Sequence, residues 1–312
     1  CQKSLWLYKH RSELREQPDA QTQSRFEVGH TVGELACQLF PGGTEIKFNP
    51  NDFDGMVKET KKLIEDGTTV IYEATFKERG VFAMADILVK EDNVWNIYEV
   101  KSSTQVKASY LDDASVQWHA LSNVIQLNKA HIVHINNQYV RNGSLDIHQL
   151  FHIQDITEIV QAKQSQVDDT LSSLENMLTS SSEPSMDIGL HCHTPYDCDF
   201  QDYCWKDIPH PSVFNLYRMS GQRKFELYHS GIVEFRDIKI GDLRNETQTV
   251  QALATLSKNV HVQPEVIQEF LDTLEYPLNF FDFETFQEAI PRFDGQRPYM
   301  QMPFQYSLHI AP

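Results

Sequence analysis

The sequence predicts an α/β fold in which a mixed sheet is flanked by helices. Segments with helical periodicity come first, segments with strand periodicity follow, and a further helix and strand come after them. Hydrophobic residues make up 40% of the 312 residues and charged residues 23%. This balance is typical of a globular protein with enough apolar material to form a buried core.

Three helices are expected in the first part of the chain, over residues 1–10, 23–39 and 54–66. In the second of these, apolar side chains recur at helical spacing, which places them on one face. Pro41 follows this helix and Gly67 follows the third, and both residue types commonly end helices.

The periodicity then changes to that of strands. Residues 69–76, 81–90 and 94–101 are rich in β-branched and aromatic side chains, and short turns separate them. A helix over residues 110–127 and a short buried-type strand over 131–136 follow. The order of helices and strands is that of a mixed sheet covered by helical layers.

The second half of the chain has a different character. One helix is expected over residues 156–178, and the Ser-rich residues 179–185 are typical of a linker or an exposed loop. Short helices are expected from residue 209 onward. The apolar runs 277–283 and 304–310 are expected to be strands.

The charge balance limits the function classes. The net charge is −17, with 27 Lys and Arg against 44 Asp and Glu, which argues against nucleic-acid binding because phosphates bind Lys and Arg. A local basic groove can still coexist with an acidic remainder. No apolar run approaches the roughly 20 residues of a membrane span, and no signal peptide is visible. We therefore expect a soluble cytoplasmic protein that does not contact a membrane.

Two carboxylates and a lysine lie in the predicted strands. Glu99 and Lys101 are two residues apart and project to one side, and Asp86 lies on the neighbouring strand. Carboxylates of this kind hold Mg²⁺ or Mn²⁺, and the backbone carbonyl of Val100 offers a further oxygen ligand. A metal held there polarises a phosphate and activates water, while the lysine orients that water. The alternative is a solvated face with a Glu–Lys pair, but charges inside apolar strands are costly unless they are used.

This arrangement is familiar. Asp86, then Glu99-Val100-Lys101 on the next strand, then a helix with Gln117, resembles the PD-(D/E)XK nuclease superfamily. The branch it resembles most is that of the RecB/AddB nucleases and the CRISPR-associated exonucleases with an iron–sulfur cluster. The resemblance implies a restriction-endonuclease-like core and Mg²⁺- or Mn²⁺-dependent cleavage of DNA, with Gln117 positioning the substrate.

The sequence departs from the family pattern at two places. Gly33 occupies the position where the family usually has a metal-binding His, which leaves Glu34 or Glu73 as the alternative ligand. The family also places a Tyr four residues after the Gln, whereas here Leu121 follows Gln117. Gln117 therefore either contacts the DNA or the metal shell, or it belongs to a polar helix face.

Cysteines form a second candidate site. Three of them recur at equal spacing: Cys192, Cys198 and Cys204. Thiolates at such spacing suggest Zn²⁺ or an iron–sulfur cluster, with Cys1 as the fourth ligand or, for zinc, His191 or His193 in its place. The resemblance to the RecB/AddB nucleases favours a 4Fe-4S cluster held by one cysteine before the nuclease core and three after it. Such a cluster would staple distant parts of the chain together.

Asp282 and Glu284 form a third candidate site, on one face of the predicted strand 277–283 and its continuation. This pair resembles the first motif of the DEDD-type (RNase H-like) exonucleases, in which two carboxylates bind a pair of metal ions. The motif needs further acidic residues downstream, so the pair is an incomplete second site. Either the segment is vestigial, or the chain is a fragment of a longer protein with another nuclease domain, and we favour the fragment because a sheet that stopped after two strands would leave an open edge. A RecB-like domain followed by a DEDD-type domain resembles an uncharacterised bacterial family.

These interpretations define three regions. Residues 1–208 are predicted to be a RecB-like nuclease domain with a four-cysteine extension, residues 209–275 a helical connector, and residues 276–312 the truncated beginning of a DEDD-type domain. The residues after the catalytic strand, Ser102 to Thr104 and Lys107, would border the active site, where they can bind phosphate.

The sequence thus predicts a metal-dependent deoxyribonuclease that acts as an exonuclease on single strands or strand ends. One alternative is a non-catalytic nucleic-acid-binding or scaffold module that positions a C-terminal exonuclease. Another is a structural domain that is stapled by Zn²⁺.

Overall fold

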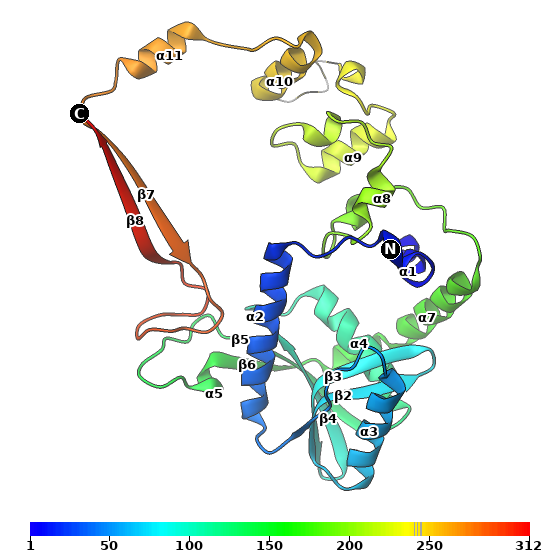
Figure 1. Cartoon of the computed structure of the whole chain (residues 1–312). Helices are drawn as coiled ribbons and strands as arrows, with labels where there is room; N and C mark the ends of the chain where they lie inside the picture. Colours follow the sequence, from blue (N-terminus) through cyan, green and yellow to red (C-terminus); the bar gives the residue numbers. More distant parts are fainter. Residues whose placement is uncertain (240, 242, 244) are drawn as a thin grey trace. The chain divides into compact units, whose positions relative to one another are not determined.

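The computed structural model describes residues 1–239, 241, 243 and 245–312 (Figure 1). The chain forms two compact units. We call one the sheet unit, which comprises Pro18–Asn176 and Phe283–Tyr306. The other, the terminal unit, comprises Cys1–Gln17, Met177–Asp282 and Ser307–Pro312. The three regions predicted from the sequence were defined by their motifs and not by compactness, so these regions stay a prediction.

A six-stranded mixed sheet is the centre of the sheet unit, and its strands follow one another in chain order from β1 to β6. The β1–β2 and β4–β5 pairs are parallel, and the other pairs are antiparallel. The strands are β1 (Thr44–Glu45), β2 (Val70–Glu78), β3 (Val81–Glu91), β4 (Val94–Lys101), β5 (Leu127–Ile135) and β6 (Phe151–Asp155). The α/β expectation and its mixed sheet are therefore confirmed.

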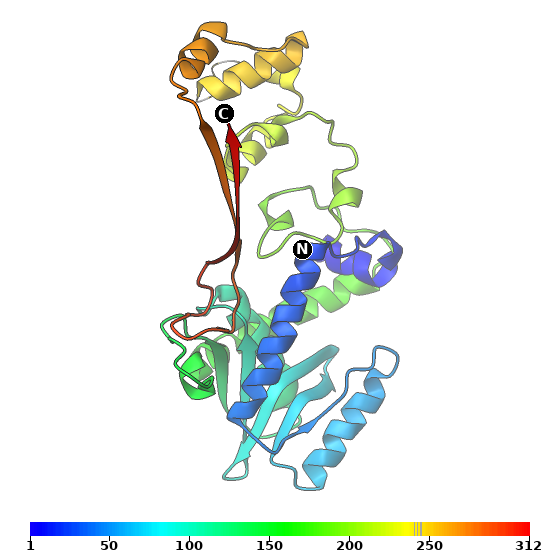
Figure 2. The same ribbon diagram turned by 60° about the vertical axis from the view of Figure 1, so that its left-hand side comes forward.

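Helices cover both faces of this sheet. The helices are α2 (Ala20–Ala36), α3 (Phe53–Glu65), α4 (Ala108–Ser122), α5 (Ile147–Leu150), α6 (Thr157–Ala162) and α7 (Gln164–Thr179). On one face, α2 runs along the sheet (Figure 2). Its Val32 and Ala36 pack with Ile87 and Tyr98 of the sheet. On the other face, residues of α3, α4 and α6 pack with alternate sheet residues such as Leu88. The sheet is thus a central layer with an apolar core on each side.

The structure differs from the sequence-based expectation at four elements. Strands β1 and β6 were not predicted, because β1 has two residues and β6 exposes four of its five side chains at an edge of the sheet. The expected helix 156–178 is two helices that separate at Lys163, where no Pro or Gly marks a break. The expected helix 110–127 ends at Ser122, and residue 127 already begins β5.

The terminal unit consists of short helices around small apolar clusters. Its helices are α1 (Gln2–His10), α8 (Gln201–Trp205), α9 (Gly221–His229), α10 (Glu246–Ser257) and α11 (Pro264–Leu271). Trp6 and Leu7 of α1 pack against the buried Phe200, which joins the first residues of the chain to the cysteine-rich segment. No helix in the described residues is long and apolar enough to cross a membrane.

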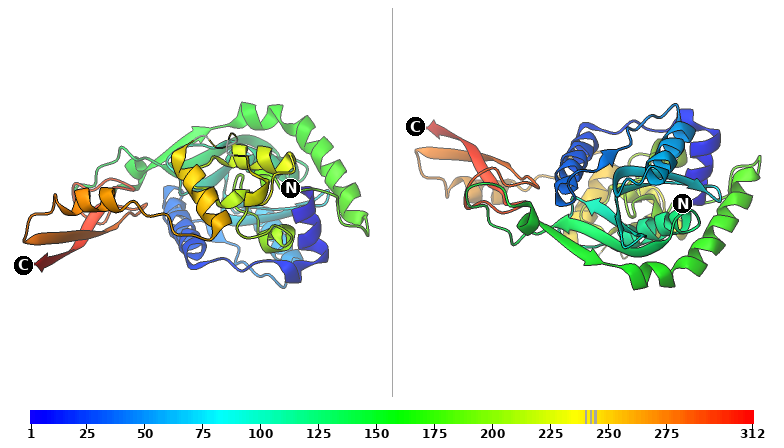
Figure 3. Two further views of the ribbon diagram at one scale, coloured as in Figure 1. Left: turned by 90° about the horizontal axis from the view of Figure 1, so that it is seen from above. Right: turned by 90° about the horizontal axis from the view of Figure 1, so that it is seen from below.

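Strands β7 (Leu278–Phe286) and β8 (Met302–Ala311) pair as a two-stranded sheet (Figure 3). The two apolar runs near the end of the sequence are therefore strands, as predicted. The residues between these strands belong to the sheet unit, where Ala289 is buried and packs in the same core cluster as α2. Arg141 donates from Nη1 to the Pro291 carbonyl at 2.9 Å, and the Gly295 amide donates to the Arg141 carbonyl at 2.8 Å.

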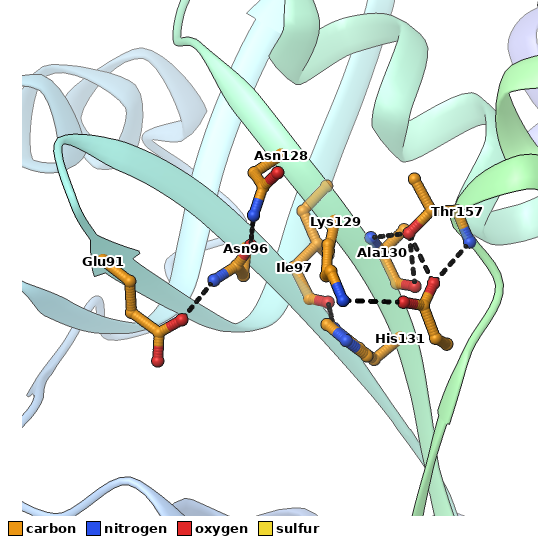
Figure 4. A network of polar contacts seen from close by, with 9 residues as sticks. Glu91, Asn96, Ile97, Asn128, Lys129, Ala130, His131 and Thr157 are labelled. Carbon is orange, nitrogen blue, oxygen red and sulfur yellow. Dashed lines mark hydrogen bonds and ion pairs between the residues drawn. The ribbon is translucent and has the colours of Figure 1, made fainter.

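A polar network fixes the edge of the sheet at the start of α6 (Figure 4). The Asp155 carboxylate accepts hydrogen bonds from the Thr157 amide at 3.0 Å and the Thr157 hydroxyl at 2.6 Å. Lys129 Nζ lies 3.1 Å from the same carboxylate. The hydrogen bonds from Thr157, with help from Lys129, lower the pKa of Asp155 to about 2. The charged form of Asp155 is therefore the one that the folded chain favours.

We expect Asp155→Asn to destabilise the protein at neutral pH but not near pH 2. A carboxyl whose pKa is lowered on folding contributes stability above its unfolded pKa, and this contribution is lost as pH falls from about 4 to about 2. The urea midpoint of the far-UV circular dichroism signal, measured for both proteins across this range, is the test. A difference between the proteins that does not shrink with pH would contradict this account of the Asp155 charge.

Candidate active site

Three carboxylates lie side by side across three neighbouring strands. Tyr72 pairs with Ile87 and Ala74 with Ala85, so Glu73 of β2 lies opposite Asp86 of β3. Ile87 in turn pairs with Tyr98, and one position further along Asp86 lies opposite Glu99 of β4. Within the described chain, the β3–β4 ladder ends at the Ile87–Tyr98 pair. The two strands therefore separate where the two acidic side chains face each other.

The separation frees backbone groups that the side chains then satisfy. Asp86 Oδ2 accepts a hydrogen bond from the Val100 amide at 2.6 Å. Glu99 is 4% exposed and accepts from Lys101 Nζ at 2.7 Å with one oxygen and from Gln117 Nε2 at 2.7 Å with the other. The predicted group of Asp86, Glu99, Lys101 and Gln117 is thus brought together at one place. The α4 helix supplies Gln117 because its buried face packs on the sheet.

The alternation of side chains changes phase at the same position in two strands, and in β2 the backbone there is distorted. Glu73 has a φ of 56°, a left-handed conformation that is rare for a non-glycine residue inside a strand. In β2, Ile71 and Ala74 both face the core on the α4 side of the sheet, although residues three apart in a regular strand face opposite sides. The alternation of side chains therefore changes phase across Glu73. In β3 the same change occurs between Ala85 and Leu88, across Asp86. Backbone strain of this kind is concentrated at functional sites in proteins, where the surrounding structure maintains it.

Burial makes these carboxyls reluctant to ionise. Burial, then the charges of Glu99 and Glu45, raises the pKa of Glu73 to about 7. Burial, then the charge of Glu73, raises the pKa of Asp86 to about 7. Burial and the nearby Asp86 raise the pKa of Glu99 to about 8. A cation at this place would relieve the repulsion and keep all three groups ionised.

Lys101 remains a cation in this environment. Burial alone would lower the pKa of Lys101, but the carboxylates of Glu99 and Asp113 raise it above its usual range. The Asp113 carboxylate lies 2.7 Å from Lys101 Nζ, and the Tyr110 ring lies 5.4 Å from it. Lys101 is therefore charged and is held in one position from two sides.

Asp113 is the member of this group that the sequence-based argument missed. It lies one helical turn before Gln117 on α4, so the two side chains share a face of that helix. That spacing was visible in the sequence and would have identified Asp113 once Gln117 had been chosen. Its carboxylate is half exposed, with 48% of the side chain accessible, so it can be reached by solvent or by a substrate.

The two alternative ligands differ in their surroundings. Glu73 is mostly buried, and its charge acts on Asp86. Glu34 is exposed on α2. Gly33 lies on the same helix, and no atom lies within 4 Å of the position that a side chain would begin to occupy there. Of the two, Glu73 is therefore the residue that the structure brings to Asp86 and Glu99.

The donor set fits a hard divalent cation. Asp86, Glu99 and the Val100 carbonyl provide oxygen atoms, which Mg²⁺ and Mn²⁺ prefer. Gln117 Oε1 is buried, and among the described residues it has no hydrogen-bond partner, an arrangement that a cation or a bound water would relieve. No three His, Cys, Asp or Glu side chains in the described parts of the chain already surround a common point as ligands. Binding would therefore need small side-chain movements, including release of Glu99 from Lys101.

The cysteines gather around one small cavity in the terminal unit. Its lining includes all four residues of the predicted cluster, Cys1, Cys192, Cys198 and Cys204, and also His191. The Cys198 amide donates to the Cys192 carbonyl at 2.9 Å, and Cys1 Sγ lies 3.1 Å from Met186 Sδ. The four thiols therefore line one cavity. In the described residues they do not form a group of three or more ligands around a common point.

Several contacts hold the first residues of the chain beside this cavity. Lys3 Nζ lies 2.7 Å from the Glu183 carboxylate, and Trp6 Nε1 donates to the Ser180 carbonyl at 2.9 Å. His193 is engaged by Asp197, with 2.6 Å between Nδ1 and the carboxylate.

Cys37 belongs to the sheet unit, where burial, followed by the charges of Glu73 and other acids, raises its thiol pKa to about 11. It is therefore a neutral thiol, apart from the other four.

Asp282 and Glu284 are both exposed on β7. They are two residues apart in one strand, so their side chains lie on one face, as the sequence indicated. The structure gives no third acidic ligand beside them among the described residues.

Comparisons with known proteins are sparse. The family described as a domain of unknown function (DUF2779) matches residues 279–312, which include β7, β8 and the loop between them. No curated protein matches the chain. The crystal structure of an alkaline exonuclease (LHK-Exo) from Laribacter hongkongensis matches with 16% identity and a TM-score of 0.20, over 56% of this chain and 90% of that one. A TM-score this low does not establish a shared fold, so the chemistry of the site must follow from its own geometry.

We expect Glu73→Gln to stabilise the metal-free protein at pH 8 and to have little effect at pH 4. A carboxyl whose pKa is raised on folding destabilises the fold as pH rises from its unfolded value of about 4 to its folded value, at a cost of at most about 4 kcal/mol. Thermal unfolding in EDTA at the two pH values measures the difference. Equal effects at both pH values would show that Glu73 is not a buried, reluctantly ionised group.

Proposed function

We propose that this protein is a divalent-metal-dependent nuclease whose active site is formed by Asp86, Glu99 and Lys101, with Glu73 as a further ligand. The observation that carries the proposal is that the buried Glu99, the partly buried Asp86 and the charged Lys101 lie together at the point where β3 and β4 separate. Buried charges are costly, and proteins retain them mainly where they bind metals or take part in chemistry. A solvated Glu–Lys pair does not account for the burial.

Each residue has a role that its position supports. A bound Mg²⁺ or Mn²⁺ would polarise the scissile phosphate and lower the pKa of water. Lys101 carries a fixed positive charge next to Glu99, so it can orient the attacking water and offset the charge that develops on phosphorus oxygens. Asp113 holds Lys101 in place, and Gln117 holds Glu99. Hydrolysis then needs no covalent intermediate on the protein.

The proposed substrate is DNA, as single strands or strand ends, and this choice comes from the resemblance to RecB-like exonucleases. The alternative is a non-catalytic module that binds nucleic acid or positions another domain. Such a module would not need the raised pKa values of Glu73, Asp86 and Glu99, which cost stability. The catalytic proposal is therefore preferred.

Lys101→Met is expected to lower the cleavage of end-labelled DNA at least about 100-fold, because it removes the charge that stabilises the transition state. Cleavage of single- and double-stranded substrates is measured with Mn²⁺ or Mg²⁺, and EDTA should abolish it. Lys77→Met is the matched control, since Lys77 lies on β2 and pairs with Asp54 at the surface.

Equal cleavage by wild type and Lys101→Met would show that the active site is misplaced. Absence of cleavage by folded wild-type protein with either metal would favour the non-catalytic module. Asp86→Asn, which preserves shape, gives an independent check because it should remove the Mn²⁺-induced rise in melting temperature as well as activity.

We further propose that Cys1, Cys192, Cys198 and Cys204 hold a 4Fe-4S cluster, or Zn²⁺ as the alternative. The support is their common cavity and the contacts that tie α1 to the cysteine-rich segment. A cluster there would add to the apolar contact, the ion pair and the hydrogen bond that already join these segments, which are far apart in the sequence. Its role would be structural.

Anaerobically purified protein is expected to contain iron and acid-labile sulfide and to absorb broadly in the visible range. Cys198→Ser should lose the colour and melt at a lower temperature, because a ligand is gone. Cys37→Ser is the control, since this thiol lies in the sheet unit. Colourless protein with stoichiometric zinc would replace the cluster by a zinc site, and protein without either metal would remove the proposal.

Asp282 and Glu284 remain a proposed fragment of a second, DEDD-type nuclease site. The support is their shared strand face within the DUF2779 match. We propose that they act only with acidic residues outside this chain, and that a protein with both domains works in the cytoplasm on DNA.

A further inference from the structure

A pocket of about 640 Å³ opens beside the residues that follow the active-site lysine. One wall is the segment from Ser103 to Lys107, which continues directly from Lys101 at the end of β4. The second wall is Asn137 and Gln138, in the loop after β5. The volume lies in the range of roughly 300–1,000 Å³ that is typical of ligand sites.

The third wall comes from the end of the chain. Residues 297–301 line the pocket, and they belong to the loop between β7 and β8 within the DUF2779 match. All three walls lie in the sheet unit, so the pocket is a feature of one compact body. A segment far away in the sequence therefore completes a cavity next to the proposed active site.

Hydrogen bonds join these walls to each other. The Tyr299 hydroxyl donates to the Ser102 carbonyl, one residue beyond Lys101. The Ile135 amide donates to the Ser103 carbonyl at 2.9 Å, and the Tyr299 amide donates to the Glu288 carbonyl at 2.7 Å. Tyr299 itself has a φ of 59°, so its backbone is strained where its side chain reaches the first wall. These hydrogen bonds therefore fix the loop between β7 and β8 next to the residues that follow Lys101.

The charge of the pocket lining differs from that of the chain as a whole. Its described lining contains two cations, Lys107 and Arg297, and no carboxylate, whereas the chain carries a net charge of −17. Both cations are exposed, and Lys107 Nζ lies 5.6 Å from the Tyr110 ring. Hydroxyl and amide side chains make up most of the rest, which suits a ligand with many hydrogen-bonding oxygens.

We propose that this pocket binds the phosphodiester backbone of a single strand next to the bond that is cleaved, with Lys107 and Arg297 each contacting a phosphate. A strand held there continues to Lys101 and the carboxylates without leaving the sheet unit. Amide groups of Asn137 and Gln301 bind sugar or base edges without selecting a sequence. The DUF2779 loop is on this account a substrate-binding element of the nuclease. The proposal rests on the proposed function for the position of the scissile bond.

The test measures binding separately from cleavage. A fluorescein-labelled oligothymidylate is titrated in EDTA at several salt concentrations, and its anisotropy is followed with wild type and with Lys107→Gln/Arg297→Gln. We expect the double variant to bind about tenfold more weakly, with a log–log salt slope smaller by about 1.4, because each phosphate contact with a single strand contributes about 0.7. Lys58→Gln/Lys61→Gln, with the same charge change on the exposed face of α3, should bind like wild type.

The outcomes separate the two proposals. If the pocket variant binds like the α3 control, the pocket proposal is overturned, whether or not wild type shows Lys101-dependent cleavage. If the pocket variant loses affinity and wild type does not cleave, the pocket stands and the nuclease proposal fails. A wild type that does not bind the oligonucleotide at all overturns the pocket. Thermal unfolding of each variant shows that the loss is not one of folding, since all four side chains are exposed.

Discussion

The main physical constraint in the sheet unit is that two carboxyl groups, the partly buried Asp86 and the buried Glu99, lie between β3 and β4. Asp86 satisfies the Val100 amide that the separating strands release, and Glu99 is held by Lys101 and Gln117. These interactions offset part of the cost of burial but leave the carboxyls with raised pKa values. A bound divalent cation would offset the cost of keeping both carboxyls ionised.

Much of this arrangement could be predicted from sequence because it depends on local periodicity. Strand spacing placed Glu99 and Lys101 on one face, and the short turn brought Asp86 to the next strand. Asp113 was missed although its helical spacing from Gln117 was available. The left-handed backbone at Glu73 could not be predicted from the sequence, because a glutamate does not indicate this conformation. It occurs where the side-chain alternation of β2 and β3 changes phase. The break at Lys163 is of the same kind.

Contacts between distant segments were the least predictable. The apolar pattern of β7 and β8 predicted two strands, but it did not indicate that the residues between them pack into the sheet unit. Ala289 is a small residue that any loop might contain, and its burial depends on the shape of the cluster beside α2. The spacing of the cysteines suggested that they gather, but their cavity forms from two segments of the terminal unit that lie far apart in the sequence.

The loop between β7 and β8 has a consequence for how this protein can be divided. Its backbone is bonded to Arg141 in both directions, and Gln296 is almost fully buried. Removal of the DUF2779 segment would therefore not leave the rest of the sheet unit unchanged. The deletion would remove Ala289 from the core cluster and expose the apolar side chains of α2 that pack in it. Aggregation of the shortened protein is therefore expected. The sheet unit is formed by two segments that lie far apart in the sequence, and the family match covers only the second of them.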